Sequence, residues 1–213
     1  AWGHYVESCE ISKPYKDFSL STVDSPLKAY FLGLMATDGW VNENRRSVSL
    51  SLVDEDCIRF LSESIGCSYA SFKKKDVNTQ PFHKFEMKGK IYDELTALGI
   101  TPRKTKNLSL NFDLIDKDLF PYLFRGIVDG DGWVRKDGKE FFVCSASKPF
   151  LDSLIPYLYD FGMHGLQVKE KEKDFYLLRS AKKQNLHVLK TFYAEPFGME
   201  RKRALLQNDV QRP

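Results

Sequence analysis

The sequence has the length and composition of an ordinary soluble protein with one large or two small domains. It contains 213 residues, of which 42% are hydrophobic and 29% are charged, and its net charge is only +3. No apolar run reaches the roughly 18 residues that a membrane span needs, and no basic and apolar leader opens the chain, so we expect an intracellular protein with no membrane partner.

The cysteines and histidines argue against a metal or disulfide scaffold. The four cysteines show no C-x-x-C spacing, and the four histidines form no close cluster with them. Free thiols in a reducing compartment are the simpler interpretation. The small net charge does not exclude a nucleic-acid partner, because one face can be basic while the rest of the surface compensates.

Residues 1–25 precede the first predicted helix and look like an extension or a packed arm. Ser25 followed by Pro26 is typical of a helix start, because Pro fits the first helical position. Apolar residues at helical spacing then predict the first helix, which Gly39 ends.

The remainder of the first half predicts two further helices and two β-hairpins. Its clearest strand carries Val48, Leu50 and Leu52 in alternation with serines, which is typical of a sheet with one buried and one open face. The predicted helices span residues 28–38, 57–65 and 91–98, and the predicted strands span 45–52, 69–75 and 82–88.

The second half repeats this order of elements. Its predicted helices span residues 119–130, 149–161 and 181–193, and its strands span 140–146, 166–173 and 175–179. Each half therefore reads α-β-β-α-β-β-α, and the chain is predicted to be α+β. The expected division is an N-terminal extension at 1–25, a first half at 26–111 and a second half at 112–213.

An internal repeat links the two halves. Residues 30–41 recur at 123–134, 93 positions later, with identical Phe, Gly, Asp, Gly, Trp and Val at matching places. The glycines inside these helices, Gly33, Gly126 and Gly130, each cost roughly 1 kcal/mol against Ala. Close approach of the two helix backbones would offset that cost, so we expect the repeated helices to pack on each other.

The two copies resemble the paired signature of the LAGLIDADG homing endonucleases. The matching stretches are Phe31–Gly39 and Phe124–Gly132, and the resemblance extends over about residues 26–206. It implies a single-chain monomer with pseudo-twofold symmetry. It also implies motif helices at the centre, and two four-stranded antiparallel sheets that form a saddle for double-stranded DNA.

The same resemblance implies a set of metal ligands. In that family the last acid of each motif binds divalent metal at the scissile phosphates, and these positions are Asp38 and Asp131 here. The backbone carbonyls of Thr37 and Gly130 are further implied ligands. The implied cofactor is Mg²⁺, for which Mn²⁺ or Ca²⁺ can substitute, and such chemistry needs little beyond carboxylates.

Two other features of the family bear on the site. A lysine after the last helix of each half is typical, and Lys104 and Lys202 occupy matching places. A cation there would stabilise developing charge or activate water. The earlier acid of the motif is Asp129 in the second copy but Ala36 in the first, which departs from the signature.

Polar and basic side chains on the open strand faces are the expected DNA contacts. A run of three lysines at 73–75 could be a solvated loop, but its place on an open face favours phosphate contacts. The predicted DNA-contacting residues are Arg45, Arg46, Ser47, Ser49, Ser51, Lys73, Lys75, Lys84, Glu86, Lys88, Arg135, Lys136, Lys139, Glu140, Lys169, Lys171 and Arg179.

The sequence therefore predicts a Mg²⁺-dependent, site-specific endonuclease that cuts both strands of DNA. The alternative is a non-cleaving nucleic-acid-binding protein of the same fold, either an RNA-splicing maturase or a transcriptional regulator. Retention of both final acids favours the nuclease. An EF-hand beginning at Asp129 is excluded, because Trp133 and Val134 fill a ligand position and the required Gly. Trp40 and Trp133 are predicted to be core residues.

Overall fold

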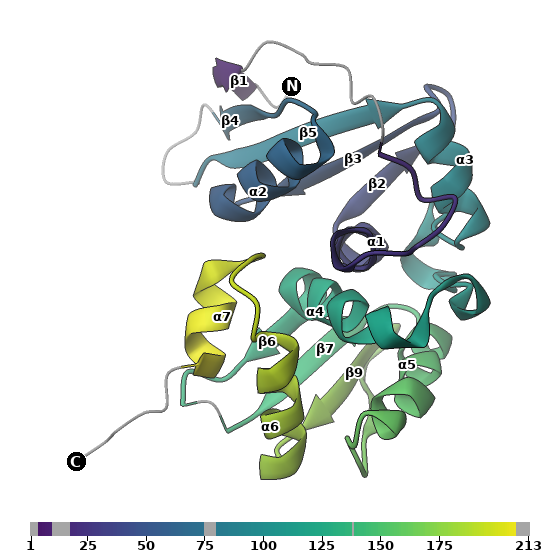
Figure 1. The fold of residues 1–213 in the computed structure, drawn as a ribbon, viewed down its shortest axis with the longest axis vertical. Helices are drawn as coiled ribbons and strands as arrows, with labels where there is room; N and C mark the ends of the chain where they lie inside the picture. Colours follow the sequence, from purple (N-terminus) through teal and green to yellow (C-terminus); the bar gives the residue numbers. More distant parts are fainter. Residues whose placement is uncertain (1–3, 10–17, 75–79, 138, 208–213) are drawn as a thin grey trace.

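The computed structural model shows two α+β halves stacked on either side of two packed central helices (Figure 1). It describes residues 4–9, 18–74, 80–137 and 139–207. The first half contains β1 (His4–Cys9), α1 (Pro26–Thr37), β2 (Gly39–Asn42), β3 (Ser47–Leu52), α2 (Glu55–Ile65), β4 (Ala70–Lys74), β5 (Phe82–Lys88) and α3 (Lys90–Ala97). The second half contains α4 (Phe120–Asp131), β6 (Gly132–Val134), β7 (Phe141–Ser145), α5 (Lys148–Asp160), β8 (Gln167–Glu172), β9 (Phe175–Ser180), α6 (Lys183–Phe192) and α7 (Glu200–Gln207). Three short 3₁₀ helices connect the halves: η1 (Lys104–Lys106), η2 (Phe112–Leu114) and η3 (Lys117–Leu119).

Both sheets are antiparallel, which confirms the predicted fold class. The first has the order β1-β4-β5-β3-β2 and the second β6-β7-β9-β8. The first sheet therefore has one strand more than the predicted four. The extra strand, β1, lies in the segment expected to be an extension, and it pairs with β4 at the edge of the sheet.

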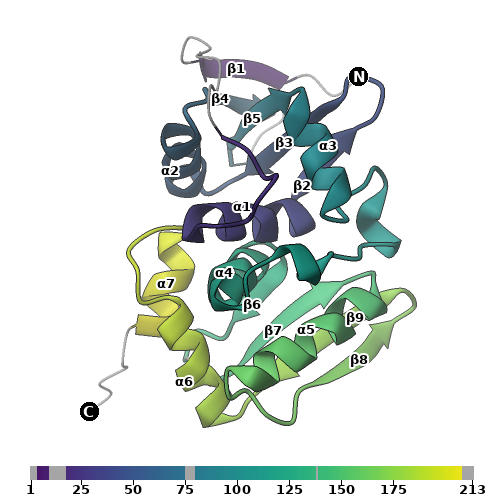
Figure 2. The same ribbon diagram turned by 45° about the vertical axis from the view of Figure 1, so that its right-hand side comes forward.

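Each sheet buries one face under helices and leaves the other free. Val48 and Leu50 on β3, with Phe85 and Met87 on β5, point into the core, where α2 and α3 cover them. In the second half α5 packs against β7, β8 and β9 in the same way (Figure 2). The alternation of the strands thus produces one dry and one open face per sheet.

The central helices α1 and α4 touch through their glycines. A methyl group on Gly33 would lie 2.2 Å from the carbonyl oxygen of Leu123 and 2.9 Å from the Cα of Gly126. The same addition at Gly126 would meet the carbonyl oxygen of Tyr30 at 2.3 Å. Only glycine permits this approach, so the predicted reason for the costly glycines is confirmed.

A last helix, α7, was not among the predicted elements. Its sequence is mostly polar, and only Lys202 and Leu206 are buried, so it carries no amphipathic pattern that would reveal a helix. α7 lies beside both halves, between α2 of the first and β6 of the second (Figure 1).

The prediction that both repeat tryptophans belong to the core is wrong. Trp40 is 51% exposed and Trp133 is 42% exposed. Because neighbouring side chains on a strand point to opposite faces, burial of Val41 on β2 and Val134 on β6 turns the preceding tryptophan to the open face.

We predict that Gly33→Ala and Gly126→Ala each lower the free energy of unfolding by more than about 2 kcal/mol, because the added methyl overlaps backbone atoms that cannot move independently. Chemical denaturation measures the change. Gly66→Ala is the control: nothing lies within 4 Å of its new methyl, and only the left-handed backbone (φ 77°) opposes it, at about 1 kcal/mol. Equal effects at all three glycines would contradict close packing of α1 and α4.

Candidate nuclease site at the ends of the central helices

The last acids of the two motifs lie where α1 and α4 end side by side. Asp38 caps α1 and Asp131 is the final residue of α4. A methyl group on Gly130 would lie 1.9 Å from Thr37 Oγ1 and 2.7 Å from Asp38 Oδ2. The glycine before Asp131 therefore lets the end of α4 meet the carboxylate of the other half.

The two carboxylates disfavour each other's charge. The pKa of Asp38 is raised to about 6, first by the surrounding protein atoms, which remove water, and then by the charge of Asp131. The pKa of Asp131 is also raised, again by desolvation, and Lys104 and Lys202 oppose that rise. The Asp38 side chain still reaches solvent, so water screens part of this repulsion.

The two predicted lysines lie at the same helix ends. Lys104 on η1 donates from Nζ to the carbonyl of Thr37 at 2.7 Å. Lys202 on α7 donates to the carbonyls of Val128, Asp129 and Gly132 at 2.7, 2.5 and 2.8 Å. Each ammonium therefore binds carbonyls at a helix C-terminus, where the helix dipole favours a cation. Desolvation lowers the pKa of both lysines, while nearby carboxylates act against that shift.

The surrounding groups offer a hard cation oxygen ligands. Within the described ranges no group of three or more His, Cys, Asp or Glu side chains could hold a metal. A cation here would be held by Asp38, Asp131 and backbone carbonyls, which are ligand types that Mg²⁺ and Ca²⁺ accept. The Thr37 carbonyl, a predicted ligand, already accepts from Lys104, whereas no such bond to the Gly130 carbonyl is found among the described residues. The raised pKa values of Asp38 and Asp131 show that their negative charges are unfavourable here. A divalent cation would neutralise those charges.

The earlier acid of the second motif turns away from this site into the interior. Asp129 is fully buried and accepts hydrogen bonds from Tyr30 Oη at 2.7 Å, Tyr193 Oη at 2.6 Å and the Met199 amide at 3.2 Å. These partners come from α1 and from the segment around α6 and α7. Asp129 thus joins the two halves, and no local pattern could have revealed partners so distant in sequence.

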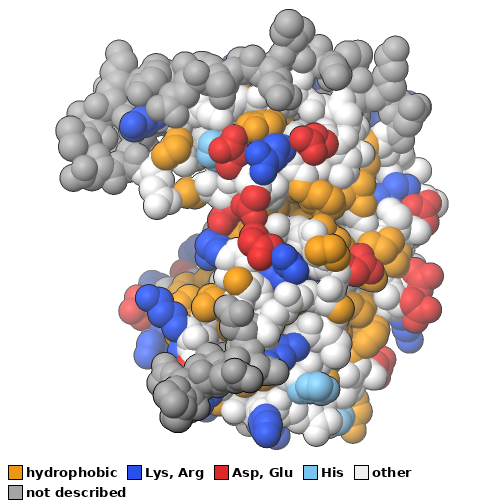
Figure 3. All heavy atoms as spheres, turned by 60° about the vertical axis from the view of Figure 1, so that its left-hand side comes forward, with side chains coloured by type: hydrophobic (Ala, Val, Ile, Leu, Met, Phe, Trp, Pro, Cys, Tyr) orange, Lys and Arg blue, Asp and Glu red, His pale blue; other side chains and the backbone are white. Residues whose placement is uncertain are grey.

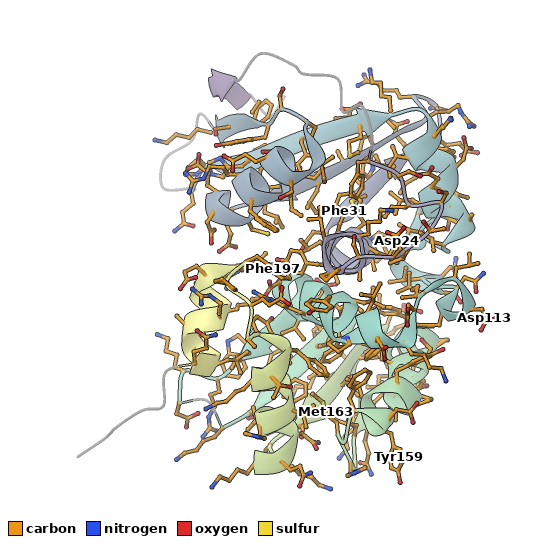
Figure 4. All side chains as sticks on the ribbon, in the orientation of Figure 1. Asp24, Phe31, Asp113, Tyr159, Met163 and Phe197 are labelled. Atoms are coloured by element: carbon orange, nitrogen blue, oxygen red, sulfur yellow. The ribbon has the colours of Figure 1, made fainter. Side chains whose placement is uncertain are left out.

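A buried arginine and a phenylalanine add to the contacts between the two halves around Asp129, which we call the seam. Arg125 on α4 lies among aromatic rings, with its guanidinium carbon 4.2 Å from the centroid of Phe197 and 4.6 Å from that of Tyr193. Phe197 also packs against Tyr30 and stacks on Phe60 of α2. Figure 4 labels Phe197 between the two halves. The segment leading to α7 therefore fills the gap beside the central helices.

The open face of the first sheet differs from the expected row of polar contacts. Ser47 and Ser49 are buried, because each is a small side chain between larger neighbours: Asn42 and Lys88 flank Ser47, and Trp40 and Glu86 flank Ser49. Ser51 is exposed, as are Arg45 and Lys88, while Lys84 and Glu86 are half-buried. Lys73 is exposed, but it lies two strand positions from Ser71, which bonds the buried His83 on the helix-covered face. Side chains two positions apart on a strand share a face, so the predicted open-face contact of Lys73 is unsupported. Lys75 lies outside the described residues.

Arg46 does not belong to that open face. Its guanidinium pairs with Asp93 of α3 at 2.5 Å and lies 4.9 Å from the ring centroid of Tyr92. It is therefore directed toward α3, on the side of the sheet opposite the open face, and its predicted DNA contact does not fit this arrangement.

The second sheet presents a mixed aromatic and basic open face. Trp133 stacks on Phe142 with ring centroids 5.2 Å apart, which accounts for an aromatic residue on the open strand. Glu140 is buried beneath Arg135 and Arg179, which both pair with it, so its predicted base contact is unsupported. The predicted basic contacts of this half are all exposed, namely Arg135, Lys136, Lys139, Lys169, Lys171 and Arg179. Figure 3 shows the molecule hollowed between its halves, with Lys and Arg side chains along the lower rim.

Solved structures share this architecture. The structure of I-DmoI in complex with DNA and Ca superposes with a TM-score of 0.59 at 14% identity, covering 89% of this chain and 98% of that one. The N-terminal LAGLIDADG domain of DUF199/WhiA gives a TM-score of 0.57 at 13% identity, covering 88% of each chain. The chain has the LAGLIDADG fold.

Sequence comparison gives a relative that matches only over part of its length. The DNA-directed RNA polymerase subunit Rpo1C of Methanocaldococcus jannaschii is 27% identical over 187 residues, which are 85% of this chain and 20% of the relative. The chain thus spans about a fifth of that protein's length. No protein-family model matches the sequence. Among the described residues no helix is long and apolar enough to cross a membrane.

We predict that Asp38→Asn stabilises the metal-free protein above pH 6 and has no effect near pH 4. The pKa of Asp38 is about 6 when folded and near 3.8 when unfolded, so the folded state holds the proton more tightly and stability falls as pH rises between these values. Urea denaturation in a chelator across this range measures the difference. Asp113→Asn, at an exposed acid on η2 (Figure 4), is the control; a pH-independent effect of Asp38→Asn would contradict the argument.

We predict that Lys202 contributes more than Lys104 to the free energy of unfolding. Lys202→Met should lower the free energy of unfolding by roughly 3 kcal/mol, because it removes a buried ammonium from three carbonyls. Lys104→Met should cost about 1 kcal/mol, since only one carbonyl loses its donor. Thermal or urea unfolding of both variants, compared with exposed Lys169→Met, tests this order, and equal losses at both lysines would refute it.

Proposed function

We propose that the chain is a divalent-metal-dependent endonuclease that cuts both strands of double-stranded DNA, one strand at each motif acid. The observation that carries this proposal is the meeting of Asp38 and Asp131 at the glycine-packed ends of α1 and α4. Two carboxylates from two halves, between two open sheet faces, suit a substrate that itself has two antiparallel strands.

The residues at the helix ends have distinct tasks in this proposal. Asp38 and Asp131 hold the cation, which we expect to be Mg²⁺, with Mn²⁺ or Ca²⁺ able to occupy the same place. A bound divalent ion would activate water and stabilise the leaving oxygen. Lys104, whose ammonium has a single carbonyl partner, is the better placed cation to stabilise charge that develops on a phosphate. Lys202 mainly holds α7 against α4.

The open sheet faces provide the contacts to DNA. Exposed basic side chains lie on both sheets and at their turns, where they can neutralise phosphates, as salt-dependent DNA binding requires. The remaining polar side chains would face base edges in the major groove, which carries a distinct pattern for each base pair. Both copies of the motif are present in one chain and already packed together, which supports a monomer.

The solved relatives support this proposal in different degrees. I-DmoI is described as a homing endonuclease, and its structures contain DNA with Ca or Mn. Their identity to this chain is low, so they support the fold, and the site argument stands on Asp38 and Asp131. The small part of the polymerase subunit that matches leaves the larger protein context open.

One observation favours the non-cleaving alternative. Both lysine ammonium groups are engaged by backbone carbonyls, and one of these is the expected ligand carbonyl of Thr37. A protein that kept the fold and the saddle without the reaction, such as an RNA-splicing maturase or a transcriptional regulator, would tolerate this arrangement.

Cleavage of a plasmid library with Mg²⁺ tests the proposal. The parent protein should linearise target plasmids, while Asp38→Asn and Asp131→Asn should each leave nicked circles at most, and the double variant should leave supercoiled DNA. Asp113→Asn is the matched control and should cut normally. DNA binding in Ca²⁺ should persist in every variant. Binding without any cutting by the parent would favour the non-cleaving alternative, and unchanged cutting by the variants would refute the site assignment.

A further inference from the structure

A cavity opens beside the first motif acid. It has a volume of about 410 Å³ and lies between the β2 turn and the segment that follows α3. Its lining includes Trp40, Asn42, Glu43, Asn44, Arg103 and Lys104. This volume falls in the range of small-ligand sites, and a large aromatic side chain with a few convergent polar groups is typical of them.

Trp40 gives this cavity an aromatic wall close to Asp38. The indole is 51% exposed although burial of so large an apolar side chain would stabilise the fold. Lys84 Nζ lies 5.5 Å from the centroid of the ring, which brings a cation to the same open surface. An exposed tryptophan two residues after the metal-binding acid would serve as a stacking surface for a base or a sugar.

Arg103 gives the cavity an available cation. It is exposed, and within the described part of the chain it forms no hydrogen bond or ion pair. Its backbone is held in the left-handed region at φ 58°, which is uncommon for a residue with a side chain and occurs more often at functional sites. An arginine that lines a cavity and has no partner among the described residues suits a phosphate.

The matching arginine of the second half, Arg201, already has a carboxylate partner. Arg201, which stands next to Lys202 as Arg103 stands next to Lys104, donates two hydrogen bonds to the carboxylate of Asp54 at 2.6 and 3.0 Å. The two halves are therefore alike in their carboxylates but differ in the cation beside them: one arginine holds α7 on the first half, and the other is open to a ligand.

We propose that this cavity binds one nucleotide of the DNA strand next to Asp38, with its base or deoxyribose against Trp40 and its phosphate on Arg103. The inference rests on the proposed function, because it takes DNA as the ligand. It adds a subsite with defined chemistry, present at the first site through Arg103 and closed at the second by the Arg201 ion pair. Trp40 and Arg103 are then positioning residues for one strand.

The proposal is tested by DNA binding without cleavage. The probe is a fluorescently labelled mixed-sequence duplex of about thirty base pairs, titrated in Ca²⁺ and followed by anisotropy. Trp40→Ala and Arg103→Gln should each weaken binding about tenfold, since loss of one stacked base or one charged phosphate contact has this size. Trp40→Phe and Arg103→Lys should recover most of the affinity, because they keep the ring and the charge.

Intrinsic fluorescence provides a second readout. The chain has three tryptophans, so a variant with Trp2→Phe and Trp133→Phe reports on Trp40 alone. The unlabelled duplex should quench its emission by stacking, and Arg103→Gln in that background should reduce the quenching at equal occupancy. Arg59→Gln, which removes the same charge from the exposed side of α2, is the matched control and should bind and quench like the parent.

The outcomes separate this inference from the function on which it rests. Duplex binding by the parent with unchanged affinity in Trp40→Ala and Arg103→Gln, and with unchanged Trp40 emission, would overturn the subsite and leave the proposed DNA-binding function intact. Absence of duplex binding by the parent would overturn both. If Trp40→Ala does not fold, as judged by circular dichroism, the emission of Trp40 and the Arg103 variants still decide the question.

Discussion

The contact between Gly33 and Gly126 sets the distance between the two halves. The positions of the two motif acids depend on that distance. Because neither residue carries a side chain, the backbones of α1 and α4 touch, and about one turn further along Gly130 lies against Thr37 and Asp38. Asp38 and Asp131 meet for this reason. The two halves that these helices join lie on either side of the hollow in Figure 3.

Bringing two acids together at two helix C-termini is electrostatically unfavourable, because both the charges and the helix dipoles are negative there. The protein offsets this with two ammonium groups, the buried one of Lys202 and the half-buried one of Lys104, that bind the terminal carbonyls. They do so unequally. The first half supplies its lysine from the loop after α3, whereas the second depends on α7, an arrangement stabilised further by the Arg201–Asp54 ion pair and by the buried Asp129. The two helix ends therefore carry similar residues but are held in place by different elements.

Local patterns were sufficient for most of the fold. The alternation around Val48 and the repeat of the motif predicted the strands, the helices and their order, and the interior glycines predicted the packing of α1 on α4. Features that depend on distant partners were beyond local patterns. The sequence of α7 is polar, and the helix is held by distant contacts such as the bonds of Lys202 to three carbonyls. The hydrogen-bond partners of Asp129 likewise lie 64 residues or more away in sequence. The tryptophans point outward because of strand register, which hydrophobicity alone does not encode. For the candidate site, sequence located the acids and the lysines, while the roles of these residues stay predictions.

The position of α7 also has a consequence for how the molecule is assembled. During synthesis the first half, with Asp38 and Lys104, emerges before α4 exists, and its sheet can form from neighbouring segments. The seam around Asp129 and Arg125 closes only when Tyr193, Phe197 and Met199 have followed. Until α7 docks, the carbonyls at the end of α4 lack the ammonium of Lys202. Completion of the contacts around the end of α4 is therefore tied to the arrival of this late segment, and a partly made chain would lack them.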